Sequence, residues 1–314
     1  DTYFATFAAV PNQVIFRLFL LLVAILGFVC DHWDIKTAFL HAKLDTIIYI
    51  KPPRGWPFDG PSGPRTYLRL LKSLYGLRQA MRLFLEELDR ILRLAGFKKL
   101  ISESCLYVRF LNGKLMLVFV YVDDILAAAA SQGEVDDLLA FLRQHFNLNS
   151  LGPITYCLGV RVTRDRAAGT ISLSQTAYID RVLHDFGFTK ALPTKASKGA
   201  AVPLRPDALQ QLRPFTAEEF DALSPKDKDD VRSFKYLGLI GSLLWIAITT
   251  RPDIAFAVIF LSRYSKCYGP QHLRALRGLL RYLRRTRTYG LVLGRSDEFS
   301  LLNQMMGQMG KTAR

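Results

Sequence analysis

Residues 115–130 form the stretch LMLVFVYVDDILAAAA, an apolar run that is interrupted only by Asp123 and Asp124. An Asn-Gly turn signal at 112–113 precedes it, and before that Cys105–Phe110 is another strand-like run. The pattern predicts adjacent antiparallel strands, with both carboxylates at the tip of the second hairpin. The plainer interpretation is a solvent-exposed turn, in which aspartate is common. The alternative is a functional site, because buried acids are costly and strands disfavour aspartate.

A third acid ends an earlier apolar stretch, in the segment DHWDIKTAFLH at 31–41. Asp34 lies 89 positions before Asp123. If the three acids converge, their oxygens suit Mg²⁺, which is typically held by one or two carboxylates together with substrate phosphates. Two such ions about 3.5–4 Å apart can activate a 3′-hydroxyl and stabilise the leaving pyrophosphate. Convergence would therefore fit nucleotidyl transfer.

Two further segments combine helical periodicity with polar side chains. In LLKSLYGLRQAMRLF at 70–84, a helix is predicted from Ser73 to Gly96, with Gly76 in its first turn and three polar residues nearby. A glycine there would let a base pair approach the backbone, whereas the plainer interpretation is an ordinary amphipathic helix. The polar residues are Arg78, Gln79 and Arg82.

The segment HLRALRGLLRYLRRTRTYG at 272–290 predicts a basic amphipathic helix. Its arginine stripe could follow a phosphate backbone or lie on an anionic membrane, and a solvated charged face is the plainer interpretation. Nucleic acid is favoured, because all the charges have one sign and the acid triad suits nucleotide chemistry. The stripe consists of Arg274, Arg277, Arg281 and Arg284.

Composition narrows the possible classes of protein. Of the 314 residues, 50% are hydrophobic, which excludes disorder for most of the chain. The net charge of +15 is uneven: residues 1–150 carry 17 Lys and Arg against 14 Asp and Glu, and residues 151–314 carry 25 against 13. This asymmetry indicates a polyanionic partner.

The longest apolar run, 18–30, is too short for a membrane span, for which about 20 residues are needed. We therefore expect a core helix and no membrane association.

The order of elements predicts an α+β fold, with strands and helices first and helices alone at the end. The chain divides into residues 1–150, residues 151–190, a linker-like segment at 191–232, a helical part at 233–297 and a ragged tail at 298–314. The four cysteines are scattered without CxxC spacing, so a reducing intracellular compartment is expected.

Seven blocks stand in the order and approximate spacing seen in the reverse transcriptase region of copia-type long-terminal-repeat retrotransposon polyproteins. They are DIKTAFLH, SLYGLRQA, YVDD, FNLNSLGPITYCLGVRVTRD, SLSQTAYIDRVLHDFG, GSLLWIAITTRPDIAFAVIFLSR and HLRALRGLLRYLRRT. The resemblance covers roughly residues 2 to 295. It implies an RNA-directed DNA polymerase with a right-hand palm, partial fingers, a thumb and a C-terminal helical connection.

The resemblance also implies roles for individual residues. Asp34, Asp123 and Asp124 are the expected catalytic residues, and together with Ile35 they form the expected ligand set for two Mg²⁺ or Mn²⁺ ions. Phe39 would be the gate against a ribose 2′-hydroxyl, with Tyr75 and Gly76 at the nascent base pair. The polar and basic residues of 70–84 and 272–290 would contact nucleic acid. The implied partners are an RNA or DNA template with its primer, deoxynucleoside triphosphates and other parts of a polyprotein, in a cytoplasmic particle or the nucleus.

Several positions depart from the family pattern. Met81 stands where proline is usual, Phe84 where tryptophan is usual, and Ala42-Lys43 replaces Gly-Asp. The family also has an upstream fingers segment and a downstream ribonuclease H domain, so we expect this chain to be a fragment or a decayed copy that polymerises weakly by itself. The alternative function is that of a catalytically inactive, nucleic-acid-binding remnant.

Overall fold

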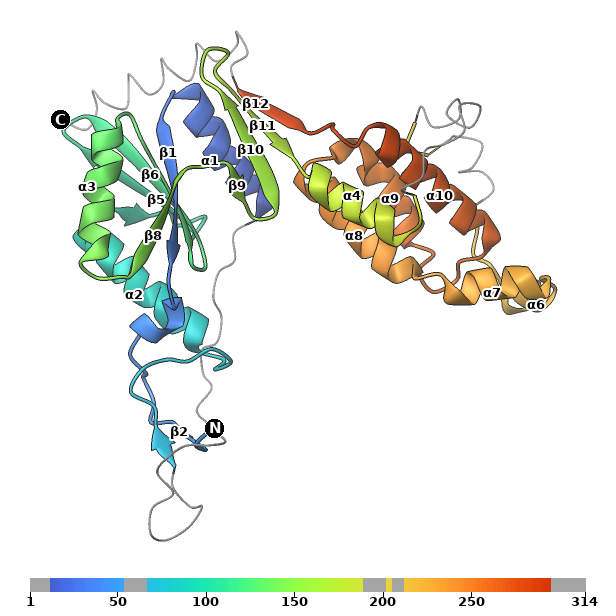
Figure 1. Cartoon of the computed structure of the whole chain (residues 1–314), viewed down its shortest axis with the longest axis horizontal. Coiled ribbons are helices and arrows are strands. Elements are labelled where there is room, and N and C mark those ends of the chain that lie inside the picture. Colours follow the sequence, from blue (N-terminus) through green and yellow to red (C-terminus); the bar gives the residue numbers. More distant parts are fainter. Residues whose placement is uncertain (1–11, 54–66, 189–201, 205–211, 295–314) are drawn as a thin grey trace. The chain divides into compact units, whose positions relative to one another are not determined.

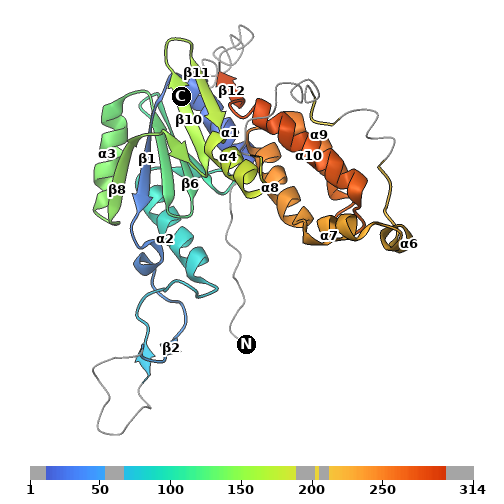
Figure 2. The ribbon, with the colours of Figure 1, turned by 45° about the vertical axis from the view of Figure 1, so that its right-hand side comes forward.

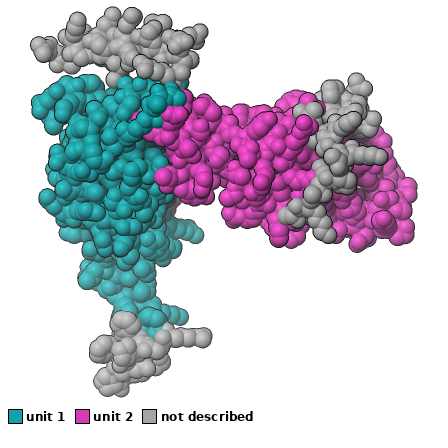
Figure 3. Space-filling model, turned by 45° about the horizontal axis from the view of Figure 1, so that its top comes forward, with its two compact units in different colours: residues 1–154, 166–169, 294–314 teal, residues 155–165, 170–293 magenta. Residues whose placement is uncertain are grey.

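The computed structural model describes residues 12–53, 67–188, 202–204 and 212–294. The chain divides into two compact units, residues 1–154 with 166–169 and 294–314, and residues 155–165 with 170–293 (Figure 3). The predicted tail at 298–314 and residues 191–201 and 205–211 of the linker-like segment lie outside the described residues.

The first unit is built on a six-stranded antiparallel sheet with the order β4-β5-β6-β7-β1-β8 (Figure 1). The elements of this unit are α1 (Gln13–Ile25), β1 (Val29–Ile35), η1 (Ala38–His41), β2 (Tyr49–Ile50), β3 (Leu68–Arg69), α2 (Ala80–Leu94), β4 (Lys98–Lys99), β5 (Leu106–Leu111), β6 (Lys114–Tyr121), β7 (Asp124–Ala129), α3 (Gln132–Arg143) and β8 (Leu148–Pro153). The strands predicted around the Asn-Gly turn and the two aspartates are therefore confirmed. β1 is inserted between β7 and β8, a long-range pairing that places it inside the sheet.

Alternating side chains of the central strands supply the two faces of this sheet. Val118 and Val120 face the core formed with α2 and α3, whose amphipathic faces are buried there. Phe119 points to the opposite face, where Phe16 and Phe19 of α1 pack with ring centroids 5.7 and 5.6 Å away. The apolar run at 18–30 is thus largely a core helix, as predicted, and its end enters β1. Both faces of the sheet are covered.

α2 starts later than predicted. The periodicity predicts a helix from Ser73, but the helix begins at Ala80, and residues 73–79 form turns. Gly76 has φ +94°, a left-handed conformation that a continuous right-handed helix excludes. The apolar spacing therefore extends beyond the helix, to Leu77 in the segment that precedes it.

The second unit combines a four-stranded sheet with a group of helices (Figure 2). Its elements are β9 (Tyr156–Cys157), β10 (Val160–Asp165), β11 (Thr170–Ser174), α4 (Thr176–Asp185), α6 (Ala217–Asp221), α7 (Pro225–Ser233), α8 (Tyr236–Thr249), η3 (Pro252–Ile254), α9 (Ala255–Ser262), α10 (Pro270–Arg285) and β12 (Leu291–Gly294). Leu243 of α8, Leu261 of α9 and Leu276 of α10 are fully buried in its core. Within the described part of the linker-like segment, 217–233 forms α6 and α7, and Val231 is buried.

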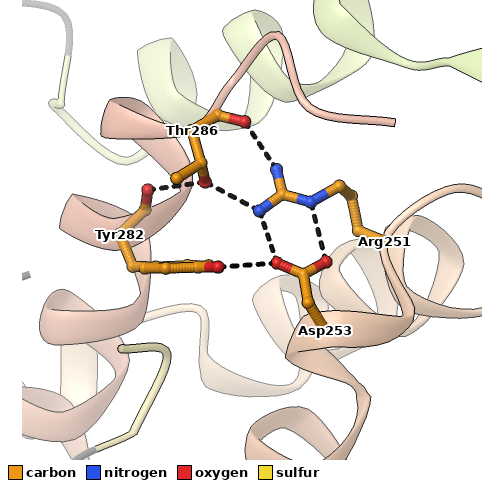
Figure 4. Close-up of polar contacts among 4 residues, drawn as sticks. All are labelled: Arg251, Asp253, Tyr282 and Thr286. Carbon is orange, nitrogen blue, oxygen red and sulfur yellow. Dashed lines mark hydrogen bonds and ion pairs between the residues drawn. The ribbon is translucent and has the colours of Figure 1, made fainter. Parts of the chain in front are cut away.

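A buried arginine joins two elements of this second unit (Figure 4). Arg251, 1% exposed, precedes η3 and donates from Nε and Nη2 to Asp253 at 2.8 and 2.7 Å. Its Nη1 donates to the carbonyl oxygen of Thr286 at 2.8 Å, and Nη2 donates to the hydroxyl of the same residue at 2.7 Å. The hydroxyl of Tyr282 donates to Asp253 at 2.8 Å. These bonds connect η3 to the C-terminal end of α10.

Two helices of the second unit, α8 and α9, are strongly apolar, so their length decides whether either could span a membrane. α8 is 14 residues long and α9 is 8. Among the described residues, none of the helices alone has both the length and the apolar character needed to cross a membrane, although α7 and α8 meet these criteria as a pair bent by 47°.

Candidate active site

Three aspartates meet at one end of two adjacent strands. In the antiparallel pairing of β1 with β7, Asp34 lies directly opposite Asp124. Asp123 precedes β7, and its carbonyl oxygen accepts a hydrogen bond from the main-chain N–H of Ile35 at 2.9 Å. Asp34 and Asp124, 90 positions apart in sequence, thus become neighbours across one strand pair. The pairing exists because β1 lies directly beside β7 in the sheet.

A tight, strained turn presents Asp123. Tyr121 pairs with Asp124, so Val122 and Asp123 are the two residues of the hairpin turn. Val122 has φ +56°. A positive φ in a β-branched residue is a genuine outlier, and a two-residue hairpin normally places glycine or asparagine there. Such strain, of order 1–3 kcal/mol, persists only where the surrounding structure fixes it, which here is the six-stranded sheet.

Crowding of the acids changes their electrostatics. Burial raises the pKa of Asp123 above its ordinary value, and repulsion from Asp124 and Asp34 raises it further, against a hydrogen bond from its own main chain. The repulsion means that the carboxylates of Asp34, Asp123 and Asp124 are close enough to interact. Oxygen donors of one sign, gathered in this way, fit a hard divalent ion such as Mg²⁺ or Mn²⁺.

Sequence reasoning missed His32, which lies beside the acids. Its Nε2 is 2.6 Å from Oδ1 of Asp124, and only 9% of its side chain is exposed. His32 and Asp34 are two positions apart on β1, so they share a face of the sheet, and this spacing was the signal available in the sequence. The contact itself depends on the β1–β7 register, which the sequence does not reveal.

The aromatic residues expected at a nucleotide lie together. Phe39 belongs to η1, and its ring centroid is 4.6 Å from that of Tyr75 and 6.1 Å from that of Phe84. Phe84 is fully buried, whereas Tyr75 is 53% exposed. Gly76, next to Tyr75, is exposed and takes the left-handed conformation described above. The structure therefore brings Phe39 and Tyr75 together on a buried aromatic support.

The polar residues beside this group are in different environments. Arg78 is exposed. Gln79 is buried, 7% exposed, and its Oε1 has no hydrogen-bond partner among the described residues. Arg82 is half-buried and forms ion pairs with Glu86, 2.9 Å away, and with Asp45, which raise the pKa of its guanidinium. Of the three side chains, that of Arg78 is the most accessible to a ligand.

The predicted arginine stripe lies on α10, in the second unit. Arg274 and Arg281 are exposed. Arg277 pairs with Asp230 of α7 at 2.6 Å, and Arg284 donates to the carbonyl oxygen of Phe188 at 3.3 Å. Two of the four arginines are therefore exposed, and the other two form contacts within the second unit. Periodicity alone could not separate these roles, because the partners lie on other segments.

The second unit also has an open cavity of about 440 Å³ at the start of α4. Its walls include Tyr156, Arg161 and Tyr178. Gln175 lines it, is 2% exposed and donates no hydrogen bond from Nε2 among the described residues, while its Oε1 accepts from Thr250 at 2.8 Å. No pattern in the sequence indicates this cavity.

Comparison with known proteins supplies the family. A family model described as reverse transcriptase (RNA-dependent DNA polymerase) matches residues 1–198. The chain is 33% identical over 292 residues to the retrovirus-related Pol polyprotein from transposon TNT 1-94 of Nicotiana tabacum, covering 93% of this chain and 21% of that protein. It is 30% identical over 299 residues to the Pol polyprotein from transposon RE1 of Arabidopsis thaliana, covering 95% of this chain and 19% of the polyprotein.

A shorter relative is covered over most of its own length. The putative transposon Ty5-1 protein of Saccharomyces cerevisiae is 31% identical over 268 residues, which are 85% of this chain and 80% of that protein. By contrast, the chain spans about a fifth of the Pol polyproteins that it matches. The family model covers well over half of the chain, and the resemblance to copia-type elements is thereby confirmed. The chain belongs to the reverse transcriptase (RNA-dependent DNA polymerase) family, as a reverse transcriptase region of the kind found in retrotransposon Pol polyproteins.

Proposed function

We propose that the first unit is the palm of a right-hand polymerase, which extends a primer 3′-hydroxyl with deoxynucleoside triphosphates on an RNA template. The observation that carries this proposal is the register of β1 and β7, which sets Asp34 opposite Asp124, with Asp123 in the adjoining turn. The family membership and the charge of the chain support the same reaction.

The acidic group would hold two divalent ions, Mg²⁺ or Mn²⁺. Asp34, Asp123 and Asp124 supply carboxylate oxygens. The side chain of Ile35 is apolar and buried, and its N–H donates to Asp123, so only its carbonyl oxygen could bind a cation. When bound, the ions activate the 3′-hydroxyl and stabilise the charge of the leaving pyrophosphate. The protein contributes by holding the carboxylates at fixed positions on paired strands.

Phe39 and Tyr75 would form one wall of the nucleotide site. Phe39 packs against Tyr75 on one side and buried Phe84 on another, so its ring cannot easily move away from an incoming sugar. A rigid aromatic side chain at the sugar would reject a 2′-hydroxyl by steric exclusion. Gly76, with no side chain, leaves the neighbouring backbone accessible to the base pair.

Template and primer would be bound by exposed cations. We assign phosphate contacts to Arg78 in the first unit and to Arg274 and Arg281 on α10, since these side chains are exposed. Gln79, Arg82, Arg277 and Arg284 were predicted to share this role. Their burial or internal pairing makes support of neighbouring segments the better assignment for them. The fingers, thumb and connection names for the remaining parts stay predictions.

The test is primer extension on an RNA template with the purified 314-residue chain, with and without Mg²⁺. We expect metal-dependent extension that Asp123→Asn reduces by several orders of magnitude. Asp137→Asn, which changes an exposed acid on α3, is the matched control. Extension that survives Asp123→Asn would refute the assignment. Binding of template and primer without extension in any variant would instead support the inactive remnant.

A further inference from the structure

His32 lies between the core and the acidic group. It belongs to β1, and its backbone is held by the regular pairing with β7, whereas the register with β8 on the other side shifts between Asp31 and Trp33. In the β1–β7 register His32 lies opposite Leu126. Leu126 and Asp124 are two positions apart on β7, so their side chains lie on the same face of the sheet. Its ring is therefore diagonal to the Asp124 carboxylate and close enough to contact it. The side chain is 9% exposed, whereas that of Asp124 is 30% exposed.

The direction of the hydrogen bond follows from its partners. An ionised carboxylate only accepts hydrogen bonds, so the hydrogen must be on Nε2 of His32. The separation of 2.6 Å from Oδ1 of Asp124 is short for an N–H···O bond, as expected for a strong bond to a charged acceptor. One lone pair of Oδ1 is consequently engaged by a donor before any cation arrives.

We propose that His32 is a positioning residue, which holds Asp124 by Oδ1 and leaves Oδ2 as the oxygen that this residue offers to a divalent cation. Asp124 is a metal ligand only under the proposed function, on which this role of His32 rests. Without the bond, Asp124 would be a partly exposed side chain repelled by two other carboxylates, and it would turn away from them. With the bond, one lone pair of Oδ1 is engaged, so Oδ2 is the oxygen better placed to bind a cation.

Burial makes His32 suited to this role. Aspartate has few rotamers, and one short bond to a fixed donor selects among them. On the face of the sheet that His32 shares, α1 packs against β6, where the rings of Phe16 and Phe19 contact Phe119. Ligand carboxylates are commonly oriented by such hydrogen bonds, and loss of the partner typically weakens metal affinity by about 10–100-fold.

The test measures Mn²⁺ binding directly, from the electron paramagnetic resonance signal of free Mn²⁺ over the full chain without nucleotide. His32→Leu removes the donor at similar size, and His32→Gln keeps an N–H donor. We expect His32→Leu to weaken Mn²⁺ binding by roughly 10-fold or more, and His32→Gln to recover most of the affinity. His145→Leu, at an exposed histidine after α3, is the matched control and should bind like the unchanged chain.

Two results would overturn the inference: Mn²⁺ affinity unchanged in His32→Leu, or lost equally in His32→Leu and His32→Gln. If His32→Leu does not fold, selective ¹⁵N-histidine labelling of the unchanged chain gives a second measurement. The Nε2–H resonance of His32 should be observed downfield and should shift in Asp124→Asn. A resonance that Asp124→Asn does not move contradicts the proposed bond.

Primer extension separates this inference from the proposed function. If the inference holds and the chain is a polymerase, His32→Leu should raise the Mg²⁺ concentration needed for half-maximal rate more than it lowers kcat at saturating Mg²⁺. If Mn²⁺ binding falls in His32→Leu but no variant extends a primer, polymerisation fails and the positioning role stands. If extension is metal-dependent and unaffected by His32→Leu, the positioning role fails and the polymerase stands.

Discussion

Arg251 should be a principal source of stability in the second unit, and Arg251→Met tests this. The substitution keeps a long apolar stem but removes two bonds to Asp253 and two to Thr286 (Figure 4). Removing one partner of a buried ion pair typically costs about 3–5 kcal/mol. Asp253 is 37% exposed and keeps its bond from Tyr282, so water can partly replace the guanidinium. We therefore expect a loss near the lower limit, about 3 kcal/mol.

The assay is urea unfolding followed by tryptophan fluorescence, because Trp245 lies on α8 within this unit. Arg263→Met, at an exposed arginine that follows α9, is the control and should change the unfolding free energy by less than about 0.5 kcal/mol. A loss below about 1 kcal/mol for Arg251→Met, or one no larger than that of Arg263→Met, would refute the reasoning. Asp253→Asn combined with Arg251→Met should cost less than the sum of the single changes, because both remove the same interaction.

Three further predictions concern other parts of the second unit. Gly290→Ala should destabilise the chain by several kcal/mol in the same urea assay, because a Cβ at Gly290 would lie 2.0 Å from the backbone oxygen of Leu173, which cannot move aside as a side chain can. Burial lowers the pKa of His272 to about 4, so the contribution of neutral His272 to stability is complete above the ordinary pKa near 6.5 and is lost as the pH falls toward 4. Thermal unfolding between these pH values should show a loss of roughly 3 kcal/mol that is absent in His272→Gln. Replacing Arg274 and Arg281 with Gln should flatten the log-log salt dependence of nucleic-acid binding by about 1.4–1.8, and an unchanged slope would exclude phosphate contacts there.

Local pattern was sufficient to predict the strands that carry the acids. The alternation and turn signals of 105–130 predict β5, β6 and β7, and the position of Asp34 at a strand end predicts that it faces the same site. What the sequence does not contain is register. The insertion of β1 between β7 and β8 pairs Asp34 with Asp124 rather than with another residue, and His32 acquires its partner by the same pairing.

Features that depend on backbone conformation or on distant partners were also missed. The helix predicted from Ser73 begins at Ala80, because the left-handed Gly76 interrupts it while apolar spacing continues. The positive φ of Val122 contradicts local preference and is imposed by the strands on either side. Nothing in the sequence distinguishes Arg251 from an arginine on the surface. Its burial depends on four hydrogen bonds to partners that the fold brings close.

Departures from the family pattern fall on packing rather than on the acids. Phe84 stands where tryptophan is usual, and it is fully buried, with its ring centroid 6.1 Å from Phe39 and 6.3 Å from Phe146. An aromatic side chain therefore still supports Phe39 at this position. Because the carboxylates are held by strand pairing, and not by the start of α2, a change such as Phe84 would alter the wall of the proposed nucleotide site without displacing Asp34. Under the proposed function, metal binding and nucleotide selection could consequently be lost independently, which is why the two are measured by separate assays.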